Sequence, residues 1–274
     1  ILFWCYKDPV VCADRVRLIR HHNPSSQIYV LYGGDVASEN GMQEALGPFV
    51  NDFWKFDLDR SAHWKWKNGD RVIARWYLQR GTQLVGWTHL FVAQWDMLLA
   101  APLGRLLEEM PDDAAVFSGR LKINDCKNWW SWVRGRKNRL RLLLFRIRLF
   151  VIERYFGPIF SAPFIIVCAP RSYFERLAMT LFAEAGYIEY RCPTFAACWG
   201  FVHWSSQQLE AWRPTNPRTF DVKERERIIS ASKAAVRPEL IRSELKNPEG
   251  FRVFHPVHCT DIDAKLGDLP YKAE

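Results

Sequence analysis

Short apolar runs separated by polar turns dominate the first part of the chain. An apolar run at 1–6 is followed by a basic, acidic and proline turn, then by helical spacing over 10–22 and by a second apolar run over 27–32. A strand, a helix and a second strand with short joins form a parallel βαβ unit. The pattern therefore predicts an α/β fold that begins with the first residues of the chain.

The same alternation continues over the rest of the sequence. Further strands are predicted at 52–56, 83–95, 114–118, 163–169 and 251–254, and helices at 70–80 and 171–185. Gly81 and Gly186 follow these two helices, as expected at helix ends. The pattern indicates a mostly parallel sheet with helices on both faces, interrupted between 119 and 160.

The apolar run at 84–96 ends on one carboxylate, Asp96. An apolar strand of this kind is usually buried on both faces of a parallel sheet, and ligands of such sheets bind at the carboxyl ends of the strands. A lone Asp in this position also serves as a turn former or a helix cap. The role of Asp96 therefore depends on what else lies at that edge.

Composition indicates a folded protein in a reducing compartment. The chain has 274 residues, of which 49% are hydrophobic and 15% aromatic. Its seven cysteines show no CxxC pair, which argues against a disulfide framework or a structural zinc site. No apolar run reaches the roughly 18 residues that span a bilayer. We expect a cytoplasmic protein. Its charge distribution, described next, adds the expectation that it lies peripherally at the inner face of a membrane.

The net charge of +8 is concentrated in one segment, 127–154. Its basic residues are Lys127, Arg134, Arg136, Lys137, Arg139, Arg141, Arg146, Arg148 and Arg154, against the single acid Glu153. The remainder of the chain is close to neutral. A local basic segment indicates a local anionic partner.

Leu, Ile and Phe surround these arginines, and the segment begins with Trp129-Trp130-Ser131-Trp132. At helical spacing Arg139 and Arg146 share one side, whereas Arg141 and Arg148 fall on the other. A helix at a lipid headgroup layer, anchored by the Trp cluster over 129–154, accommodates this pattern. The alternative is a packed helix whose arginines pair with acids of another element or subunit. We expect no nucleic-acid partner, because Leu, Ile and Phe have no role along a phosphate backbone.

Four features occur together in the chain: the turn Lys7-Asp8-Pro9 after the first strand, Gly33-Gly34-Asp35 after the second, Asp96 after an apolar strand, and a late Phe254-His255-Pro256. With them the chain resembles the nucleotide-sugar glycosyltransferases of the GT-A fold. The resemblance covers most of the chain. It implies a Rossmann-like three-layer α/β/α fold in a single catalytic domain, 1–274, with a basic aromatic insertion at about 119–160.

The resemblance also implies a metal site. In this family an Asp-x-Asp-like motif and a late His hold a divalent cation, and the matching residues are Asp96 and His255. Mn²⁺ or Mg²⁺ would neutralise the leaving nucleoside diphosphate. Gln94 stands where the family often has a first acid. His258 is a substitute for His255, whose other role is that of a hydrogen-bonded loop residue. The literal motif Asp57-Leu58-Asp59 does not end a long apolar strand, so we interpret it as a surface turn.

Other positions are expected at the nucleotide. They are Tyr6, Gly33, Gly34, Asp35, Lys67 and Asp70. Tyr6 is expected at the base, and the two glycines allow a close approach of the backbone. A glycine pair is also the usual composition of a strand-to-loop turn, and Asp70 could cap the helix that follows it.

An inverting transfer needs a general base to take the proton of the acceptor hydroxyl. Glu189 is the first candidate because it lies among aromatic residues that could stack on a sugar, with Glu184 and Asp125 as competitors. Pairing of Glu189 with Arg191 is the structural alternative, and retention of configuration would remove the need for the base.

The sequence thus predicts a metal-dependent glycosyltransferase that uses a nucleotide-sugar donor. Its acceptor would be a carbohydrate or a lipid-linked molecule at a membrane surface. The alternative is a non-catalytic protein that binds glycan or membrane on a degenerate transferase fold.

Overall fold

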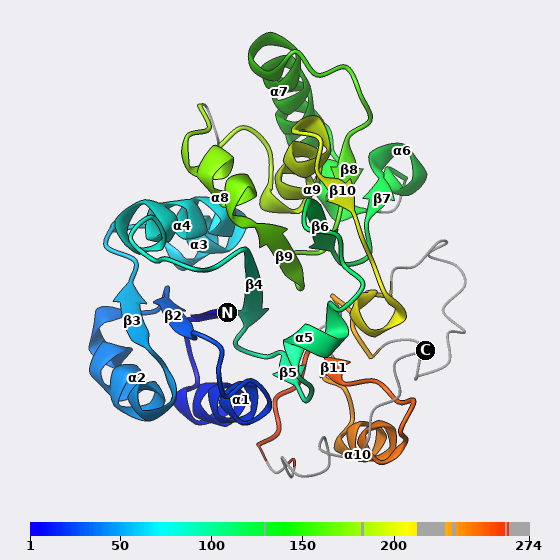
Figure 1. Ribbon diagram of the computed structural model, residues 1–274. Coiled ribbons are helices and arrows are strands. Elements are labelled where there is room, and N and C mark those ends of the chain that lie inside the picture. Colours follow the sequence, from blue (N-terminus) through cyan, green and yellow to red (C-terminus); the bar gives the residue numbers. More distant parts are fainter. Residues whose placement is uncertain (129, 182–183, 213–227, 232–233, 261, 263–274) are drawn as a thin grey trace.

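A seven-stranded sheet runs through the molecule (Figure 1). The computed structural model describes residues 1–128, 130–181, 184–212, 228–231, 234–260 and 262. In spatial order the strands are β10 (Val202–His203), β6 (Ala114–Phe117), β9 (Val167–Pro170), β4 (His89–Gln94), β1 (Leu2–Cys5), β2 (Tyr29–Tyr32) and β3 (Asp52–Lys55). Of these seven, β9 runs antiparallel to both its neighbours, and the other pairs are parallel.

Two short antiparallel ladders lie outside this sheet. One pairs β5 (Leu98–Leu99) with β11 (Val253–Phe254), and the other pairs β7 (Leu121–Lys122) with β8 (Phe160–Ser161). The first ladder brings a late segment of the chain beside the end of β4. The second closes the base of the excursion between β6 and β9.

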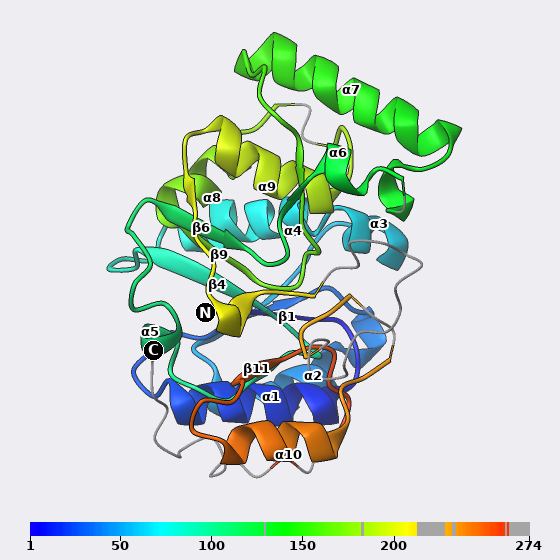
Figure 2. The ribbon, with the colours of Figure 1, turned by 90° about the vertical axis from the view of Figure 1, so that its right-hand side faces the viewer.

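Helices cover both faces of the sheet (Figures 1 and 2). They are α1 (Pro9–His22), α2 (Glu39–Leu46), α3 (Ala62–Lys67), α4 (Gly69–Trp76), α5 (Leu103–Leu106), α6 (Ile123–Cys126), α7 (Arg136–Glu153), α8 (Arg171–Ala178), α9 (Ile188–Cys198) and α10 (Pro238–Lys246). Single turns occur at Val36–Ser38, Gly47–Phe49, Tyr77–Gly81, Ser131–Val133 and Gln207–Leu209.

Alternate residues of the central strands divide the core into two apolar clusters. In β1, Phe3 joins the cluster of α1, α2 and α10, and Trp4 joins the cluster of α4, α7, α8 and α9. In β4, Phe91 and Val92 divide in the same way. Because successive side chains of a strand point to opposite faces, the two clusters are the two sides of one sheet. The predicted three-layer α/β/α arrangement with a mostly parallel sheet is confirmed.

Most of the predicted elements are confirmed. The predicted strands at 1–6, 27–32, 52–56, 114–118 and 251–254 appear as β1, β2, β3, β6 and β11, and the predicted helix at 10–22 appears as α1. The helix expected over 70–80 appears as α4 and the turn that continues it to Gly81. Asp8 begins α1, because its side chain accepts a hydrogen bond from the backbone N–H of Val11 at 3.1 Å.

Three predicted extents are wrong. The strand expected over 83–95 begins only at His89, because Gly86 has a φ of 77° and interrupts the extended run. The strand expected from 163 begins at Val167, since residues 164–165 form a turn in which the N–H of Ile165 donates to the carbonyl of Pro163 at 2.9 Å. The helix expected over 171–185 ends at Ala178, and the hydroxyl of Thr180 then bonds back to the carbonyl of Arg176 at 2.8 Å.

Helices α9 and α10 were not predicted, and neither were the short helices α3, α5 and α6. Pro193 lies inside α9, and the mixed aromatic and polar pattern of 188–198 did not indicate a helix. Within the described residues, no helix is long and apolar enough to cross a membrane.

Candidate functional site

The carboxyl ends of three central strands lie along one edge of the sheet. Strand β1 pairs in parallel with β2 on one side and with β4 on the other, so all three end in the same direction. Tyr6 follows β1, Gly33 follows β2, and Asp96 comes two residues after the end of β4. This is the edge at which open α/β sheets bind their ligands.

The β5–β11 ladder brings His255 to Asp96. Phe254 lies opposite Leu98, and the backbone N–H of Val257 donates to the carbonyl of Asp96 at 2.8 Å. His255 Nε2 lies 3.3 Å from Asp96 Oδ1. Both side chains are largely buried, with 8% of His255 and 14% of Asp96 exposed. The structure therefore brings together the two residues that the sequence indicated for a metal.

A hydrogen bond on the side of the ring away from Asp96 fixes the orientation of His255. Its Nδ1 lies 2.8 Å from the carbonyl oxygen of Ser230, which can only accept, so Nδ1 carries a proton. In the neutral ring Nε2 is then a bare lone pair that faces a carboxylate oxygen. Apart from each other, Nε2 and Asp96 Oδ1 have no hydrogen-bond partner among the described residues. A second proton on the ring, or a cation between the two atoms, completes this pair.

The electrostatics of Asp96 favour its ionised form. Burial acts to raise the pKa of Asp96, but the hydrogen bond and the charge of His255, helped by His258, outweigh it, and the pKa lies below its ordinary value. His258 Nε2 lies 3.9 Å from Asp96 Oδ2, and the His258 ring stacks on Trp95 at 5.5 Å. The expected substitute ligand is thus also beside Asp96.

These residues fit a divalent cation that takes further ligands from a substrate. One carboxylate and one imidazole present unpartnered, buried atoms to the same point. Within the described part of the chain, no group of three His, Cys, Asp or Glu side chains could hold a metal ion by itself. The chain supplies two donors, and phosphate oxygens of a nucleotide would supply others.

Gln94 has a structural role. Its amide Nε2 donates to the carbonyl of Phe164, in the segment that precedes β9. A carboxylate in this position has no N–H to donate. The residue that replaces the first acid of the expected motif therefore links β4 to the segment before β9.

Tyr6 and Lys7 border the same edge. The Tyr6 ring is 43% exposed and packs edge-on against Trp95, with centroids 5.9 Å apart. Lys7 Nζ lies 4.4 Å from the centre of the Trp95 ring. Burial of its inner part raises the pKa of Tyr6. An exposed aromatic ring and an exposed cation therefore lie next to Asp96.

The glycine turn holds the ends of β1 and β2 together. The N–H of Gly33 donates to the carbonyl of Cys5 at 2.8 Å. A Cβ on Gly34 would lie 2.5 Å from the carbonyl oxygen of Tyr6 and 2.4 Å from the Tyr32 hydroxyl. Gly34 is therefore required for this close approach. Asp35, which follows, is exposed.

Lys65 is a candidate residue that the sequence reasoning missed. Its Nζ donates to the carbonyl of Gly33 at 2.9 Å. Burial lowers the pKa of Lys65, while the nearby Asp35 acts to raise it. Lys65 lies two residues before Lys67, and no feature of the sequence distinguishes the two lysines. Only the packing of α3 decides which of them reaches the glycine turn.

Lys67 lies in a different cluster. Its Nζ lies 5.3 Å from the centre of the Tyr187 ring, and the guanidinium of Arg141 lies 4.9 Å from the same ring. Burial, Arg141 and Lys137 all lower the pKa of Lys67. The expected nucleotide ligand Lys67 therefore lies beside α7 and the start of α9.

Asp70 is not open to a ligand. Arg191 donates to it from Nε at 2.9 Å and from Nη2 at 2.6 Å, and both side chains are fully buried. Arg191 also donates to Asn68 Oδ1 at 3.0 Å. This pair attaches α4 to α9 and engages both carboxylate oxygens of Asp70.

Glu189 lies in the first turn of α9 and is half-buried. Its backbone carbonyl accepts from the N–H of Ala162 at 2.8 Å. Ala162 is two residues before Phe164, which is bound by Gln94 at the end of β4. The start of α9 is thereby linked to the edge that carries Asp96.

The other candidates for the general base and for the metal motif lie at the surface. Asp125 is exposed in α6, and Glu184 lines a shallow cavity with Arg71 and Arg75. Asp57 pairs with Arg75 through two hydrogen bonds of 2.6 and 2.5 Å. The segment Asp57-Leu58-Asp59 is therefore a surface turn that is held by an arginine.

No protein-family model and no curated protein matches this sequence. Among solved structures, the chain is similar to galactosyltransferase LgtC in complex with donor and acceptor sugar analogs, with 9% identity over 76% of this chain and 73% of that chain and a TM-score of 0.41. An active-site mutant of LgtC is similar with 10% identity, 79% and 80% coverage and a TM-score of 0.41. Mouse xyloside xylosyltransferase 1 in its apo form is similar with 9% identity, 75% and 83% coverage and a TM-score of 0.34. These similarities assign no residue of the site.

Proposed function

We propose that the protein is a metal-dependent glycosyltransferase that moves a sugar from a nucleoside-diphosphate sugar to a carbohydrate or lipid-linked acceptor. One observation carries the proposal. Asp96 Oδ1 and His255 Nε2 face each other at 3.3 Å, buried and without another hydrogen-bond partner among the described residues, at the carboxyl edge of a parallel sheet. A structural pair would be completed by donors of the protein itself.

Asp96 and His255 would hold the cation, with His258 beside them. When bound, Mn²⁺ or Mg²⁺ would neutralise the negative charge that develops on the departing nucleoside diphosphate. A carboxylate with an imidazole suits Mn²⁺ better than Mg²⁺, which prefers oxygen ligands alone. The hydrogen bond from His255 Nδ1 to Ser230 fixes the ring so that Nε2 points at this position.

The donor nucleotide would lie over the ends of β1 and β2. Tyr6 offers an exposed aromatic face for the base, and the exposed carboxylate of Asp35 suits the hydroxyls of a ribose. Lys65, held at the glycine turn, and Lys7, held over Trp95, supply positive charge on two sides. These four side chains replace the expected set that included Lys67 and Asp70.

We assign Glu189 as the general base of an inverting transfer. It lies at the start of α9, two residues after Tyr187, whose ring contacts Trp132 at 4.7 Å. Aromatic rings of this kind stack on sugars, and the cations Lys67 and Arg141 beside Tyr187 suit an acceptor that carries phosphate. In this role Glu189 takes the proton of the acceptor hydroxyl as the new glycosidic bond forms.

The alternative function is a non-catalytic protein that binds glycan or membrane on the same fold. The bond from Gln94 to Phe164 favours it, because this bond leaves one carboxylate where two would hold a metal more tightly. Transfer and hydrolysis of the donor distinguish the two functions.

The test is release of sugar from UDP-, GDP- and dTDP-sugars with Mn²⁺, measured for the wild type, Asp96→Asn and the surface control Asp57→Asn. We expect turnover with one nucleotide, retained in Asp57→Asn and reduced at least 100-fold in Asp96→Asn. Binding of a nucleotide without turnover would favour the alternative, and the absence of both would contradict the proposal.

The assignment of Glu189 has its own test. Glu189→Gln should lower acceptor-dependent transfer by about 10²–10⁴-fold with little change in donor binding. Analysis of the anomeric configuration of the product should show inversion, and a product with retained configuration would exclude this role.

A further inference from the structure

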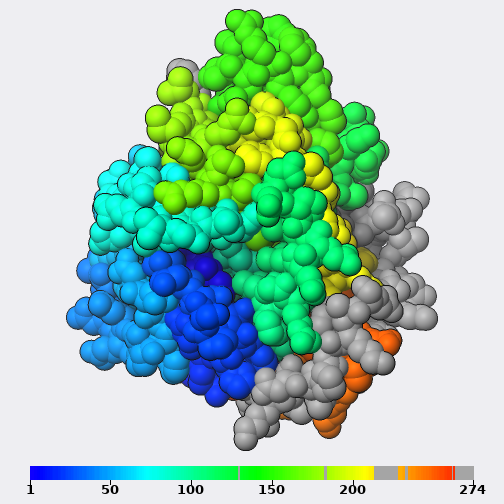
Figure 3. All heavy atoms as spheres, viewed as in Figure 1, coloured from blue at the N-terminus to red at the C-terminus, as the bar shows by residue number. Residues whose placement is uncertain are grey.

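An apolar ridge lies along the outer side of α7. We call it the α7 ridge, and it consists of Leu140, Leu143, Leu144, Ile147, Phe150, Val151 and Phe156. Its helical members are between 49 and 56% exposed and Phe156 is 76% exposed. They recur at intervals of three and four, so they form one stripe. Figure 3 shows the helix standing at one end of the molecule, and Figure 2 shows it outside α8 and α9.

The opposite side of α7 already packs on the body of the protein. Phe145, Arg148 and Leu149 are buried, and the Arg148 guanidinium lies 4.6 Å from the centre of the Phe195 ring. Arg148 also pairs with Glu153 at 2.7 Å. The helix is therefore apolar on two sides, and only the inner side is used by the fold.

The charged residues of the segment that carries the α7 ridge are basic with the single exception of Glu153. Exposed basic residues near it are Arg136, Lys137, Arg139, Arg146 and Arg154. The one acid between 127 and 160 is Glu153, which is paired with Arg148. An exposed apolar stripe with uncompensated positive charge complements a surface that is apolar inside and anionic outside.

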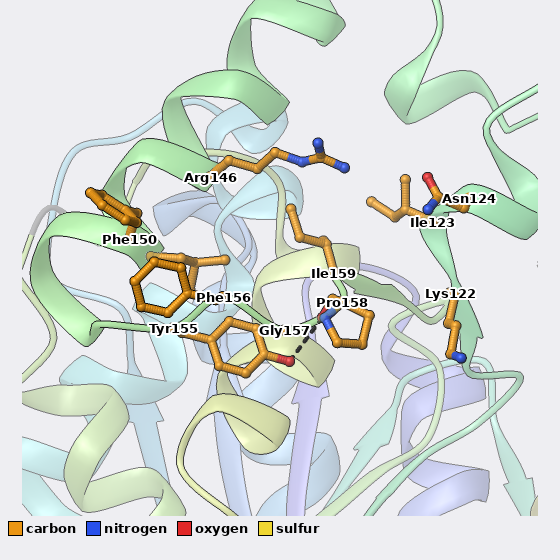
Figure 4. Close-up of a pocket in the computed structure, with 11 residues that line it drawn as sticks. Lys122, Ile123, Asn124, Arg146, Phe150, Tyr155, Phe156, Gly157, Pro158 and Ile159 are labelled. Atoms are coloured by element: carbon orange, nitrogen blue, oxygen red, sulfur yellow. Dashed lines mark hydrogen bonds between the residues drawn. The ribbon is translucent and has the colours of Figure 1, made fainter.

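A cavity of about 390 Å³ opens at the end of the α7 ridge. Phe150, Phe156 and Ile159 line it together with the cations Lys122 and Arg146. Figure 4 shows the two phenylalanines on one side of it and Lys122 on the other. Phe150 and Phe156 contact each other edge-on at 4.9 Å. The cavity is thus lined by both aromatic rings and cations, which suits a lipid phosphate with its acyl chains.

The expected tryptophan anchor is corrected. Trp130 is buried in the core, and Trp132 packs between Trp66 and Tyr187 at 4.9 and 4.7 Å. Trp129 lies outside the described residues. The exposed apolar surface is provided by α7 and Phe156 instead.

We propose that the α7 ridge docks the protein on a bilayer that contains anionic phospholipid. The apolar side chains enter the boundary between headgroups and acyl chains, the arginines meet lipid phosphates, and the cavity receives one phospholipid headgroup. Tyr187 contacts Arg141 of α7 and lies two residues before Glu189, so docking brings the start of α9 near the lipid surface. The reason for docking rests on the proposed function, because a lipid-linked acceptor would lie in the membrane. Lipid binding itself does not require glycosyl transfer.

The test is co-sedimentation of the full chain with vesicles of phosphatidylcholine alone and with vesicles that also contain phosphatidylglycerol. We expect binding to the anionic vesicles that falls at least tenfold at high salt. Phe150→Ser with Phe156→Ser, and separately Arg139→Glu with Arg146→Glu, should each weaken this binding at least tenfold. The matched controls are Val85→Ser, at a residue that is 91% exposed elsewhere, and Lys246→Glu, and both should bind as the wild type does.

Three results would overturn the proposal: equal binding to both kinds of vesicle, wild-type binding by both double variants, or burial of the α7 ridge in a stable dimer without lipid. Circular dichroism establishes that each variant is folded. Loss of lipid binding with donor hydrolysis intact contradicts this inference alone. Loss of hydrolysis with lipid binding intact contradicts the proposed function alone.

Discussion

Two buried aspartates in this protein, Asp70 and Asp96, differ in whether the protein itself satisfies their hydrogen bonds. Asp70 is bound through both oxygens by Arg191, with both side chains 0% exposed. Asp96 faces His255 at 3.3 Å, and the two facing atoms lack any other partner in the described part of the chain. A pair that the protein completes by itself stabilises the fold. A pair that it leaves incomplete at the edge of a parallel sheet is available to a ligand.

The largest expected effect is on the complete pair. Arg191→Met leaves the carboxylate of Asp70 buried without its partner, and removal of one member of a buried pair costs about 3–5 kcal/mol. Urea unfolding should show this loss as a lower midpoint with an unchanged slope. Arg75→Met is the matched control, because its pair with Asp57 is over a third exposed. A loss below about 1 kcal/mol for Arg191→Met would remove the contrast between the two pairs.

The second effect is on the incomplete pair. His255→Gln removes the imidazole from the candidate cation position, and loss of even an outer partner of a metal lowers affinity about 10–100-fold. The increase in melting temperature caused by Mn²⁺ and the nucleotide together should therefore disappear or shrink. The exposed His63→Gln is the control and should keep the whole increase. The same ligand-induced increase in His255→Gln would show that His255 is only a loop residue.

The third effect concerns the missing acid. Gln94→Glu removes the amide that donates to Phe164 and turns a carboxylate toward a carbonyl, which costs about 1–3 kcal/mol. We expect lower stability and no gain in Mn²⁺ affinity. Gln83→Glu, at an exposed position, is the control. A gain in metal affinity with unchanged stability would mean that Gln94 is a weakened ligand and not a link between strands.

The smallest effect concerns the surface pair of Asp57 with Arg75. The hydrogen bonds from Arg75 lower the pKa of Asp57 to about 2. A lowered pKa stabilises the fold above the unfolded value of about 4, and this stabilisation is lost as pH falls from about 4 to about 2. Because the side chains are 37% and 40% exposed, solvent screens the pair to less than about 1 kcal/mol. Asp57→Asn should unfold slightly earlier than the wild type in urea at neutral pH and at the same midpoint near pH 2. A difference that persists at that pH would contradict this account.

Local patterns were sufficient for much of the fold. The strands β1, β2 and β3 and the helix α1 follow from apolar runs, Pro9 and the polar turns between them. Asp96 was identified because a carboxylate after an apolar run is a local feature. His255 required the resemblance, since the β5–β11 ladder that brings it to Asp96 joins segments far apart in the sequence.

The remaining errors have tertiary causes. Nothing near Asp70 in the sequence indicates that Arg191 will bind it, because the two residues are brought together only by the packing of α4 against α9. The choice of Lys65 over Lys67 depends on how α3 packs against the glycine turn. The segment of α7 has arginines on both sides, so its pattern alone did not separate the packed side from the exposed one.

The most direct test of the central claim is calorimetric titration of Mn²⁺ into the protein with and without the nucleoside diphosphate that raises its melting temperature most. If the phosphates of the nucleotide complete the ligand set of a Mn²⁺ held by Asp96 and His255, each ligand strengthens the binding of the other by the same factor. The account predicts one Mn²⁺ per chain, bound at least tenfold more tightly with nucleotide, and loss of that site in Asp96→Asn. Equal Mn²⁺ binding by the wild type and Asp96→Asn, or no effect of any nucleotide on Mn²⁺ binding, would contradict it.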